Sequence, residues 1–323
     1  MIDTAPSLAS RLVRLMRDRP IFPLILLLLA LVGMLQIMNP GVVNLLWFGN
    51  ALKIAIPLAM IGGCQTLTML TGGIDLSAGT VATISAFVMV TLVPLVGAPE
   101  AIAISLACAL VAGLVNGFGV AIARVHPLIM TLGTGLIGNG CLLVYQRFVI
   151  ATGTRIPDFV LWLGTGKTLG LPNGLALFIP FAALLIWGQY RTGFGRLLYA
   201  IGSNEPAARL SGVRSWQVYF SLYALSGMIA GITGLLYIGQ VKSPSLSLAL
   251  PLDLPSVAAA VVGGTSIFGG RGGYGGTIVG ALILTVLTTM LTLLHLPEGA
   301  RRILFGMIIL AVTAVYIRLT DQS

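Results

Sequence analysis

Few side chains of this sequence could do chemistry, and they do not cluster. The chain has only 2 histidines: His126 precedes Pro127 beside Arg124, and His295 stands shortly before Pro297. A metal site or a catalytic triad needs several such groups brought together, and no cluster of Asp, Glu or Cys accompanies either histidine. We therefore predict no catalytic residue, no metal site and no cofactor, and we interpret both histidines as residues of the membrane interface.

Two glycine-containing stretches imitate nucleotide-binding motifs. Gly166-Lys167-Thr168 matches the end of a phosphate-binding loop, but Leu161 stands where that loop requires a glycine. The stretch 270–275 fits G-x-G-x-x-G, yet it lies between two apolar segments and does not follow a strand of a βαβ unit. Neither stretch predicts nucleotide binding, so no ATP-binding motif is recognised in the chain.

Asp75 is the acidic residue that lies embedded between apolar stretches. An ionisable residue at membrane depth is a candidate for a transport pathway. Its carboxylate could instead cap the helix that begins near Leu76, where free N–H groups and the positive end of the helix dipole meet. We favour this structural role, in which Asn replaces Asp75 with little loss and Ala costs about 0.5 to 2 kcal/mol of local stability.

The composition is that of an integral membrane protein. Hydrophobic residues make up 57% and charged residues 8% of the chain, and the mean hydropathy is +1.02, whereas soluble domains are about 25% charged. The net charge of +9 does not indicate a nucleic-acid partner, because the basic residues lie in short segments between apolar stretches. We expect Cys64, Cys108 and Cys141, which lack metal-ligand spacing, to pack as small buried residues.

A membrane-spanning helix needs about 20 apolar residues. The sequence offers about ten such segments, some of them shorter, which predicts an all-α polytopic membrane protein with glycine-rich breaks after the second and eighth spans. Residues 1–20 are predicted to be a cytosolic segment before an uncleaved first helix, residues 21–318 the transmembrane domain, and residues 319–323 a tail. The predicted spans are residues 21–38, 53–71, 78–96, 101–123, 127–146, 174–190, 218–238, 254–268, 275–295 and 303–318.

The basic residues predict the orientation, because cytosolic ends of spans carry more Lys and Arg than outer ends. A cytosolic N-terminus puts both termini in the cytosol and divides the 18 basic residues into eleven inside and seven outside. The bias is modest, and Arg301 with Arg302 argues against it. The inner group is Arg11, Arg14, Arg17, Arg19, Arg124, Arg191, Arg196, Arg209, Arg214, Arg271 and Arg318, and the outer group is Lys53, Arg147, Arg155, Lys167, Lys242, Arg301 and Arg302.

The polar stretch 191–214 interrupts the apolar pattern with a short helix of its own. Asn204 is a suitable N-cap, Glu205 and Pro206 suit the first turn, and Gly212 can end the helix in a left-handed conformation. A helix of about seven residues is marginal alone, so neighbouring segments or a partner must hold it. The stretch is predicted to be a docking element, and the alternative is an ordinary basic loop on the cytosolic side.

Residues 72–79, GGIDLSAG, and residues 263–276, GGTSIFGGRGGYGG, each join a Gly-Gly break to a new apolar helix. Glycine-interrupted segments in corresponding halves of a transporter indicate a transport site, because irregular backbone at membrane depth must be buried or line a cavity. The alternative is that both stretches are tight interfacial turns and that the glycines serve close helix packing.

Three segments resemble the permeases of bacterial ABC sugar importers, in the ribose, xylose and autoinducer-2 branch. Residues 71–79, TGGIDLSAG, differ from the family signature T-G-G-I-D-L-S-V-G at Ala78, and residues 261–272 resemble V-V-G-G-T-S-x-x-G-G-x-G. Residues 198–213, LYAIGSNEPAARLSGV, resemble the coupling loop and depart from it at Pro206. The three segments stand in order across residues 71–276, which makes the match specific.

The resemblance implies a permease subunit, not itself an enzyme, of an ATP-driven importer for a sugar or a similar small hydroxylated solute in the bacterial inner membrane. The implied partners are cytosolic ABC ATPase subunits, a second permease copy or paralogue, an extracytoplasmic solute-binding protein and membrane lipid. The implied ATPase-coupling helix contains Asn204, Glu205, Ala207, Ala208, Arg209 and Gly212. The implied translocation or structural motifs contain Gly72, Gly73, Asp75, Ser77, Gly263, Gly264, Thr265, Gly269 and Gly270.

Two other functions compete with this interpretation. An ion-coupled secondary transporter would need carboxylates or histidines within the membrane, and Asp75 is the only candidate. An integral-membrane enzyme would need converging acid, base or metal-binding residues, which the sequence does not show. Neither alternative accounts for the three ordered segments. No residue of the sequence selects a particular solute or decides between two identical permeases and a pair of different ones.

Overall fold

The computed structural model describes residues 21–149 and 153–295, together with residues 297, 299–300, 303–304, 306–307 and 310. Within this part of the chain, 8 helices are long and apolar enough to cross a membrane. The protein is an all-α polytopic membrane protein, as the composition predicts. These helices are α2 (Ile21–Met38), α3 (Leu45–Leu70), α4 (Ala78–Val96), α5 (Ala98–Ala121), α6 (Pro127–Val149), α8 (Gly174–Arg191), α11 (Ser215–Val241) and α13 (Tyr274–Leu293).

Shorter elements connect these helices. A two-stranded antiparallel hairpin follows α7 and pairs Lys167 with Pro172. The sequence did not predict α7 or this hairpin, since both are too short to produce a clear periodic pattern. The short elements are α7 (Asp158–Thr165), β1 (Lys167–Thr168), β2 (Leu171–Pro172), α9 (Gly193–Ser203), α10 (Glu205–Leu210), η1 (Leu250–Leu252) and α12 (Asp253–Val262).

Several predicted spans differ from the observed helices. The second begins at Leu45 and not near residue 53, because Lys53 lies within α3 and does not mark its start. The predicted eighth span, residues 254–268, is the helix α12 of 10 residues followed by irregular backbone, which is too short to cross a bilayer alone. The predicted segments 1–20 and 319–323 and most of the tenth span, 303–318, lie outside the described residues.

The helix α11 is the centre of the packing. It contacts α4 and α5 along their lengths and also touches α3 and α7, and its glycines explain how it comes so close. A Cβ atom added to Gly227 would lie 2.5 Å from the carbonyl oxygen of Ala109 and 2.8 Å from the Cα atom of Gly113. Small residues thus let the α5 and α11 backbones touch, which is how membrane helices gain packing energy.

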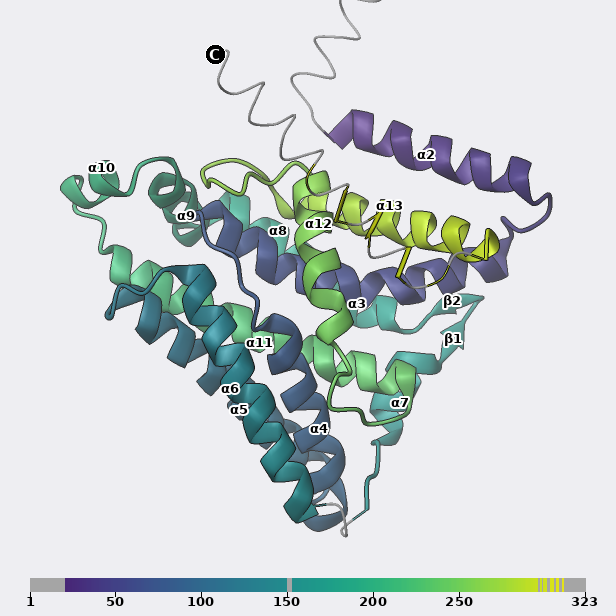
Figure 1. Ribbon diagram of the computed structural model, residues 1–323, viewed down its shortest axis with the longest axis horizontal. Helices are drawn as coiled ribbons and strands as arrows, with labels where there is room; N and C mark the ends of the chain where they lie inside the picture. The colour runs from purple at the N-terminus through teal and green to yellow at the C-terminus, as the bar shows by residue number, and fades with distance from the viewer. Residues whose placement is uncertain are drawn as a thin grey trace, which may run out of the picture.

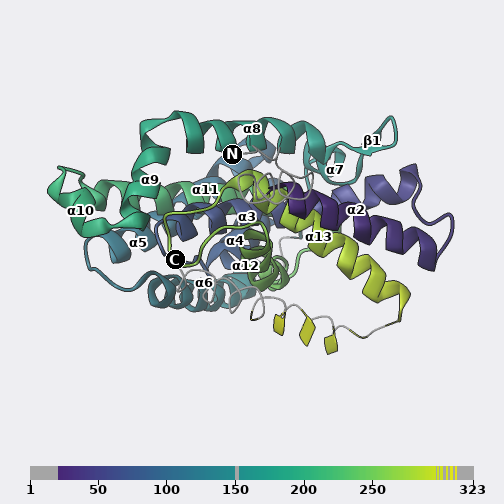
Figure 2. The ribbon, with the colours of Figure 1, turned by 90° about the horizontal axis from the view of Figure 1, so that it is seen from above.

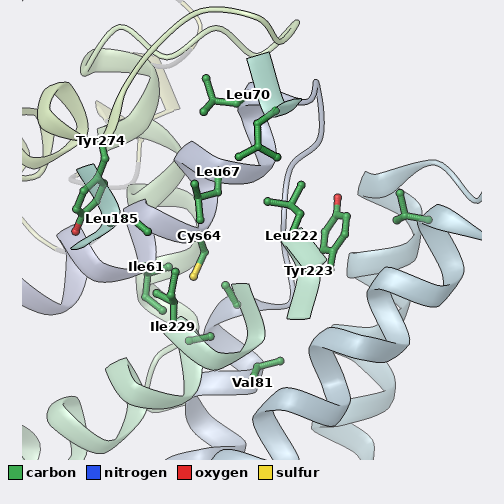
Figure 3. Packing of buried hydrophobic residues seen from close by; sticks show 14 of the residues in the cluster. Ile61, Cys64, Leu67, Leu70, Val81, Leu185, Leu222, Tyr223, Ile229 and Tyr274 are labelled. Atoms are coloured by element: carbon green, nitrogen blue, oxygen red, sulfur yellow. The ribbon is translucent and has the colours of Figure 1, made fainter. Parts of the chain in front are cut away.

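The hydrophobic core joins α3, α8, α11 and α13. Figure 3 shows Cys64 of α3 within this cluster, with Leu222 and Ile229 of α11 nearby. Cys64 is buried as predicted, but Cys108 is only partly buried and Cys141 is exposed on the surface of the chain. The prediction that all three cysteines are buried was therefore wrong for Cys141, since apolar flanks do not distinguish a core-facing from an outward-facing helix surface in a membrane protein.

The helices are arranged so that the two groups of short elements lie far apart. In Figures 1 and 2, α2 lies beside α13, and Figure 1 shows α4, α5 and α6 descending together toward one vertex of the molecule. The helices α9 and α10 lie at one end of the molecule, and the β1–β2 hairpin lies at the opposite end (Figure 1). The predicted docking stretch and the β1–β2 hairpin, which closely follows the end of α7 at Thr165, are thus well separated.

Candidate functional site

The short helix α10 is built as the sequence predicts. The Oδ1 atom of Asn204 accepts a hydrogen bond from the backbone N–H of Ala207 at 3.0 Å, which caps the helix. At the other end Gly212 has a φ of +87°, and the N–H of Val213 donates to the carbonyl of Ala208 at 3.1 Å. This pattern closes a helix through a left-handed glycine. The local signals of capping and termination therefore set where α10 begins and ends.

One side of α10 is held by the protein and the other is open. Ala208 is buried, and the hydroxyl of Tyr219 on α11 donates to Glu205 Oε2 at 3.1 Å. Leu210, by contrast, is 91% exposed. A helix of 6 residues would not persist alone, so these contacts hold it in place while its outer side stays exposed.

The three motif segments meet at one point of the backbone. The N–H of Gly270 donates to the carbonyl of Leu70, at the end of α3, with a distance of 2.9 Å. Gly202, near the end of α9, packs against both residues so closely that a Cβ atom there would overlap the Leu70 carbonyl oxygen. A Cβ atom on Gly269 would likewise lie 2.8 Å from the Gly202 carbonyl oxygen. We call this contact of Leu70, Gly202, Gly269 and Gly270 the glycine junction.

A chain of hydrogen bonds surrounds the glycine junction. The Tyr199 hydroxyl accepts from Gln189 Nε2 at 2.7 Å and donates to the carbonyl of Gly272 at 2.8 Å. Gln189 Oε1 accepts from the N–H of Tyr274 at 2.9 Å, and the Tyr274 hydroxyl donates to the carbonyl of Ala59 at 3.1 Å. Burial, with a smaller effect of Tyr190, raises the pKa of Tyr199, so its hydroxyl stays protonated. The chain of bonds links α8 and α9 to α13 and α3.

Asp75 lies in a buried polar network. The residue is 2% exposed. The Oδ1 atom accepts hydrogen bonds from the Ser77 hydroxyl at 2.6 Å and from the Ser77 N–H at 3.0 Å. The Oδ2 atom accepts one from the Ser226 hydroxyl at 2.6 Å. Gln65 bonds both backbone groups of Asp75, at 2.7 and 3.2 Å. Asn116 donates to the Ser77 hydroxyl at 2.8 Å. The carboxylate therefore has three donors from the protein itself, which is what a buried anion requires.

The expectation that Asp75 caps the following helix needs a correction. The helix α4 begins at Ala78, and the N–H that Asp75 binds belongs to Ser77, just before it. The carboxylate that reaches the first turn is that of Asp253, whose Oδ1 accepts from the N–H of Gly79 at 2.7 Å. Asp75 is thus not the only acid between apolar stretches. Asp253 joins the start of α12 to the start of α4.

The remaining motif residues shape the two breaks. Gly72, with a φ of +77°, and Gly264, with a φ of +88°, turn the chain after α3 and α12, a backbone conformation that glycine adopts without strain. Gly263 packs directly on the backbone of Gly276, and Thr265 is buried with no partner for its hydroxyl among the described residues. No group of 3 or more His, Cys, Asp and Glu residues comes together within the described part of the chain.

The sequence reasoning missed the polar partners of Asp75. Gln65 and Asn116 lie inside spans at 0% and 1% exposure, and a buried amide in an apolar helix is a signal that could have identified them. Ser226 and Asp253 are harder to recognise from the sequence as buried polar residues. A serine is common in membrane helices, and Asp253 stands at the boundary of its apolar segment, where a solvated acid is equally expected.

The chain is similar to known transport permeases over most of its length. Residues 47–313 match the family described as the permease component of the branched-chain amino acid transport system. The ribose import permease protein RbsC of Escherichia coli is 33% identical over 292 residues, which cover 89% of this chain and 91% of that protein. No solved structure matches the chain.

Two further relatives differ in the solute that their names give. The fructose import permease protein FrcC of Rhizobium meliloti is 30% identical over 301 residues, or 91% of this chain and 84% of that protein. An autoinducer 2 import system permease protein, LsrC of Escherichia coli, is 31% identical over 289 residues, or 89% of this chain and 83% of that protein. The similarity extends over nearly the whole chain in each case.

Proposed function

Because the chain belongs to the family of permease components of branched-chain amino acid transport systems, we propose that it is the membrane-spanning subunit of an ATP-driven importer for a sugar or a similar small hydroxylated solute. The relatives named for ribose, fructose and autoinducer 2 support this solute class. No described residue selects one of these solutes over the others, so the proposal stops at the class.

The observation that carries the proposal is the glycine junction. A coupling element must transmit movement from an exposed surface to the membrane spans. The helix α9 can do so because its residue Gly202 lies against Leu70, at the end of α3, and against Gly270, in the glycine-rich break after α12. Two glycine backbones in contact leave no flexible side chain between them to absorb a shift. Movement of α10 and α9 is therefore passed directly to Leu70 and Gly270.

In the proposed mechanism, two cytosolic ATPase subunits bind α10 of this chain and of a second permease, identical or related. Closure of the ATPases on ATP moves α10 and α9, and the glycine junction passes the movement to α3 and α12 so that the pathway opens alternately to each side. An extracytoplasmic binding protein delivers the solute. High affinity can reside in that protein, and the permease then needs only a weakly polar pathway.

The proposed orientation places α10 and both termini in the cytosol. The separation of α10 from the β1–β2 hairpin by the length of the molecule (Figure 1) supports it, and so does the modest excess of basic residues on that side. The predicted coupling residues Asn204, Glu205, Ala207, Ala208, Arg209 and Gly212 would then form or support the contact with the ATPase.

Replacement of Gly202 by Ala tests the proposal. The permease, its ATPase and its binding protein would be reconstituted in liposomes, and solute-stimulated ATP hydrolysis and uptake would be measured with a panel of sugars. We expect Gly202→Ala to uncouple hydrolysis from solute, because the new methyl group forces α9 away from Leu70. Gly193→Ala is the matched control, since a Cβ atom at Gly193 meets no atom of the described residues within 4 Å.

Two results would contradict the proposal. Normal solute-stimulated hydrolysis in Gly202→Ala would show that the glycine junction does not carry the coupling. Uptake that needs no ATPase and follows an imposed proton gradient would show a secondary transporter. In that case the buried network of Asp75 would become the candidate ion pathway.

A further inference from the structure

A cavity of about 1130 Å³ opens between α10 and the loop that joins α5 to α6. Three membrane spans have an end in its wall, since α5 ends at Ala121, α6 begins at Pro127 and α11 begins at Ser215. The cavity therefore lies at the level where apolar helix surface gives way to polar loops. This is the depth of phospholipid headgroups.

The cavity has an excess of positive charge. Arg124, Arg209 and Arg214 line it, and Glu205 is the one acidic residue in the lining that the structure describes. Glu205 already accepts a hydrogen bond from Tyr219. None of the three guanidinium groups has a hydrogen bond or an ion pair with another described residue. The charge is thus free to act on a bound molecule.

Ser215 supplies an independent sign of a missing ligand. Its side chain lines the cavity at 6% exposure, and its Oγ atom is buried with no hydrogen-bond partner among the described residues. A buried polar group is normally paired, because leaving it unpaired is costly. Ser215 also stands at the N-terminus of α11, where the helix dipole favours negative charge. The orphaned hydroxyl therefore points to an anionic acceptor.

The flanks of the cavity are apolar. Trp216 lines it and is 50% exposed, which is typical of an indole at the membrane interface. Phe118 of α5 and Ile129 of α6 stand nearby in the sequence, on the spans themselves, and are 55% and 63% exposed. A segment of a cytosolic partner would leave these side chains uncovered, whereas an acyl chain can cover them.

We propose that this cavity binds the phosphate headgroup of an anionic phospholipid. The guanidinium groups of Arg124 and Arg214 neutralise the phosphate, Ser215 donates a hydrogen bond to it, and the acyl chains extend from the mouth along α5 and α6. Basic pockets between membrane helices bind anionic headgroups in this way. The bound lipid would hold α10 against α5 and α6, so the lipid composition would affect the position of α10.

Quenching of Trp216 fluorescence tests the proposal in the full-length permease. Trp216 would be kept as the sole tryptophan by replacement of Trp47, Trp162 and Trp187 with Phe. Brominated phosphatidylglycerol and brominated phosphatidylcholine would be compared in bilayers of otherwise equal composition. Each basic residue near the surface contributes about 1 kcal/mol to anionic-lipid binding, or about fivefold in affinity. Arg124→Gln with Arg214→Gln should therefore lower the preference for phosphatidylglycerol about 25-fold.

Matched variants separate a site from general charge attraction. Arg191→Gln with Arg196→Gln removes the same charge from exposed positions in α8 and α9 that do not line the cavity, and it should leave the preference almost unchanged. Ser215→Ala should weaken phosphatidylglycerol binding several-fold without lowering the melting temperature, because the hydroxyl it removes has no partner among the described residues. An equal loss in both double variants would overturn the proposal.

Two other occupants give different results. If millimolar inorganic phosphate abolishes the phosphatidylglycerol preference, the cavity takes a soluble anion, and the lipid assignment is wrong. If Arg124→Gln with Arg214→Gln keeps the lipid preference but no longer copurifies with the ATPase, the cavity is a protein contact, and the assignment is also wrong. The lipid-binding measurements use the isolated permease, so failure of the transport proposal leaves them intact.

Discussion

Substitution of Asp75 separates a structural carboxylate from a functional one. Asp75→Ala deletes the acceptor of three hydrogen bonds, from the Ser77 N–H, the Ser77 hydroxyl and the Ser226 hydroxyl. Each buried donor left without a partner costs about 1–3 kcal/mol. Hydroxyl protons can rotate toward other acceptors, but the backbone N–H of Ser77 cannot. We therefore expect Asp75→Ala to lower the free energy of unfolding by about 2–5 kcal/mol, which is more than the roughly 0.5 to 2 kcal/mol that removal of a simple helix cap costs.

Asp75→Asn should be much milder. The amide oxygen can keep both bonds from Ser77, while the amide nitrogen faces the Ser226 hydroxyl, which must turn to accept. Loss of charge weakens each bond, but it also removes the cost of burying an anion. These effects oppose each other, so we expect Asp75→Asn to lower the free energy of unfolding by only about 1 kcal/mol.

The measurement is thermal unfolding of the purified permease in detergent, followed by circular dichroism, together with solute uptake in liposomes. Asp158→Ala is a control, because Asp158 is exposed in the first turn of α7. A melting temperature of Asp75→Ala equal to that of the parent would refute the structural role. An inactive but well-folded Asp75→Asn, with uptake by the parent that depends on a proton gradient, would show that the charge itself is needed.

Three further changes test other parts of the structure. Gly212→Val should destabilise α10 and lower the coupling of ATP hydrolysis to transport, because a β-branched residue is strained at a φ of +87°. Gly212→Asn should keep most of this coupling. Equal coupling in the two variants would argue against the left-handed helix end. Single cysteines at Ser203 and Thr165, in a chain without Cys64, Cys108 and Cys141, should react with impermeant reagents from opposite sides of the membrane; labelling of both from outside would contradict the proposed orientation. Tyr199→Phe should lower the stability of the purified permease by about 1–3 kcal/mol, since it leaves Gln189 Nε2 and the Gly272 carbonyl without their present partner; an unchanged melting temperature would show that this link is dispensable.

Features that depend on neighbouring residues were predictable from the sequence. The cap at Asn204 and the left-handed Gly212 follow from side-chain chemistry within one helical turn. Hydropathy, however, reports only whether a segment is apolar, so it could not show that α12 ends at Val262 or that Lys53 lies inside α3.

Contacts between distant residues were not predictable. Asp253 binds the N–H of Gly79, 174 residues away in the chain, and no local pattern in either segment indicates the other. The same holds for the glycine junction, where the motif segments could be recognised separately but their meeting point depends on the packing of whole helices. The roles of the motif residues in coupling and translocation stay predictions.

The short helix α12 is fixed at both ends. Its first residue, Asp253, holds the start of α4 through Gly79, and the loop after its last turn holds the end of α3 through Gly270. A helix of 10 residues is about 15 Å long and does not bend appreciably over that length. It can therefore act as a rigid rod between the surface where α9 lies and the buried start of α4. A shift at one end of α12 must therefore either break one of these two hydrogen bonds or reappear at the other end.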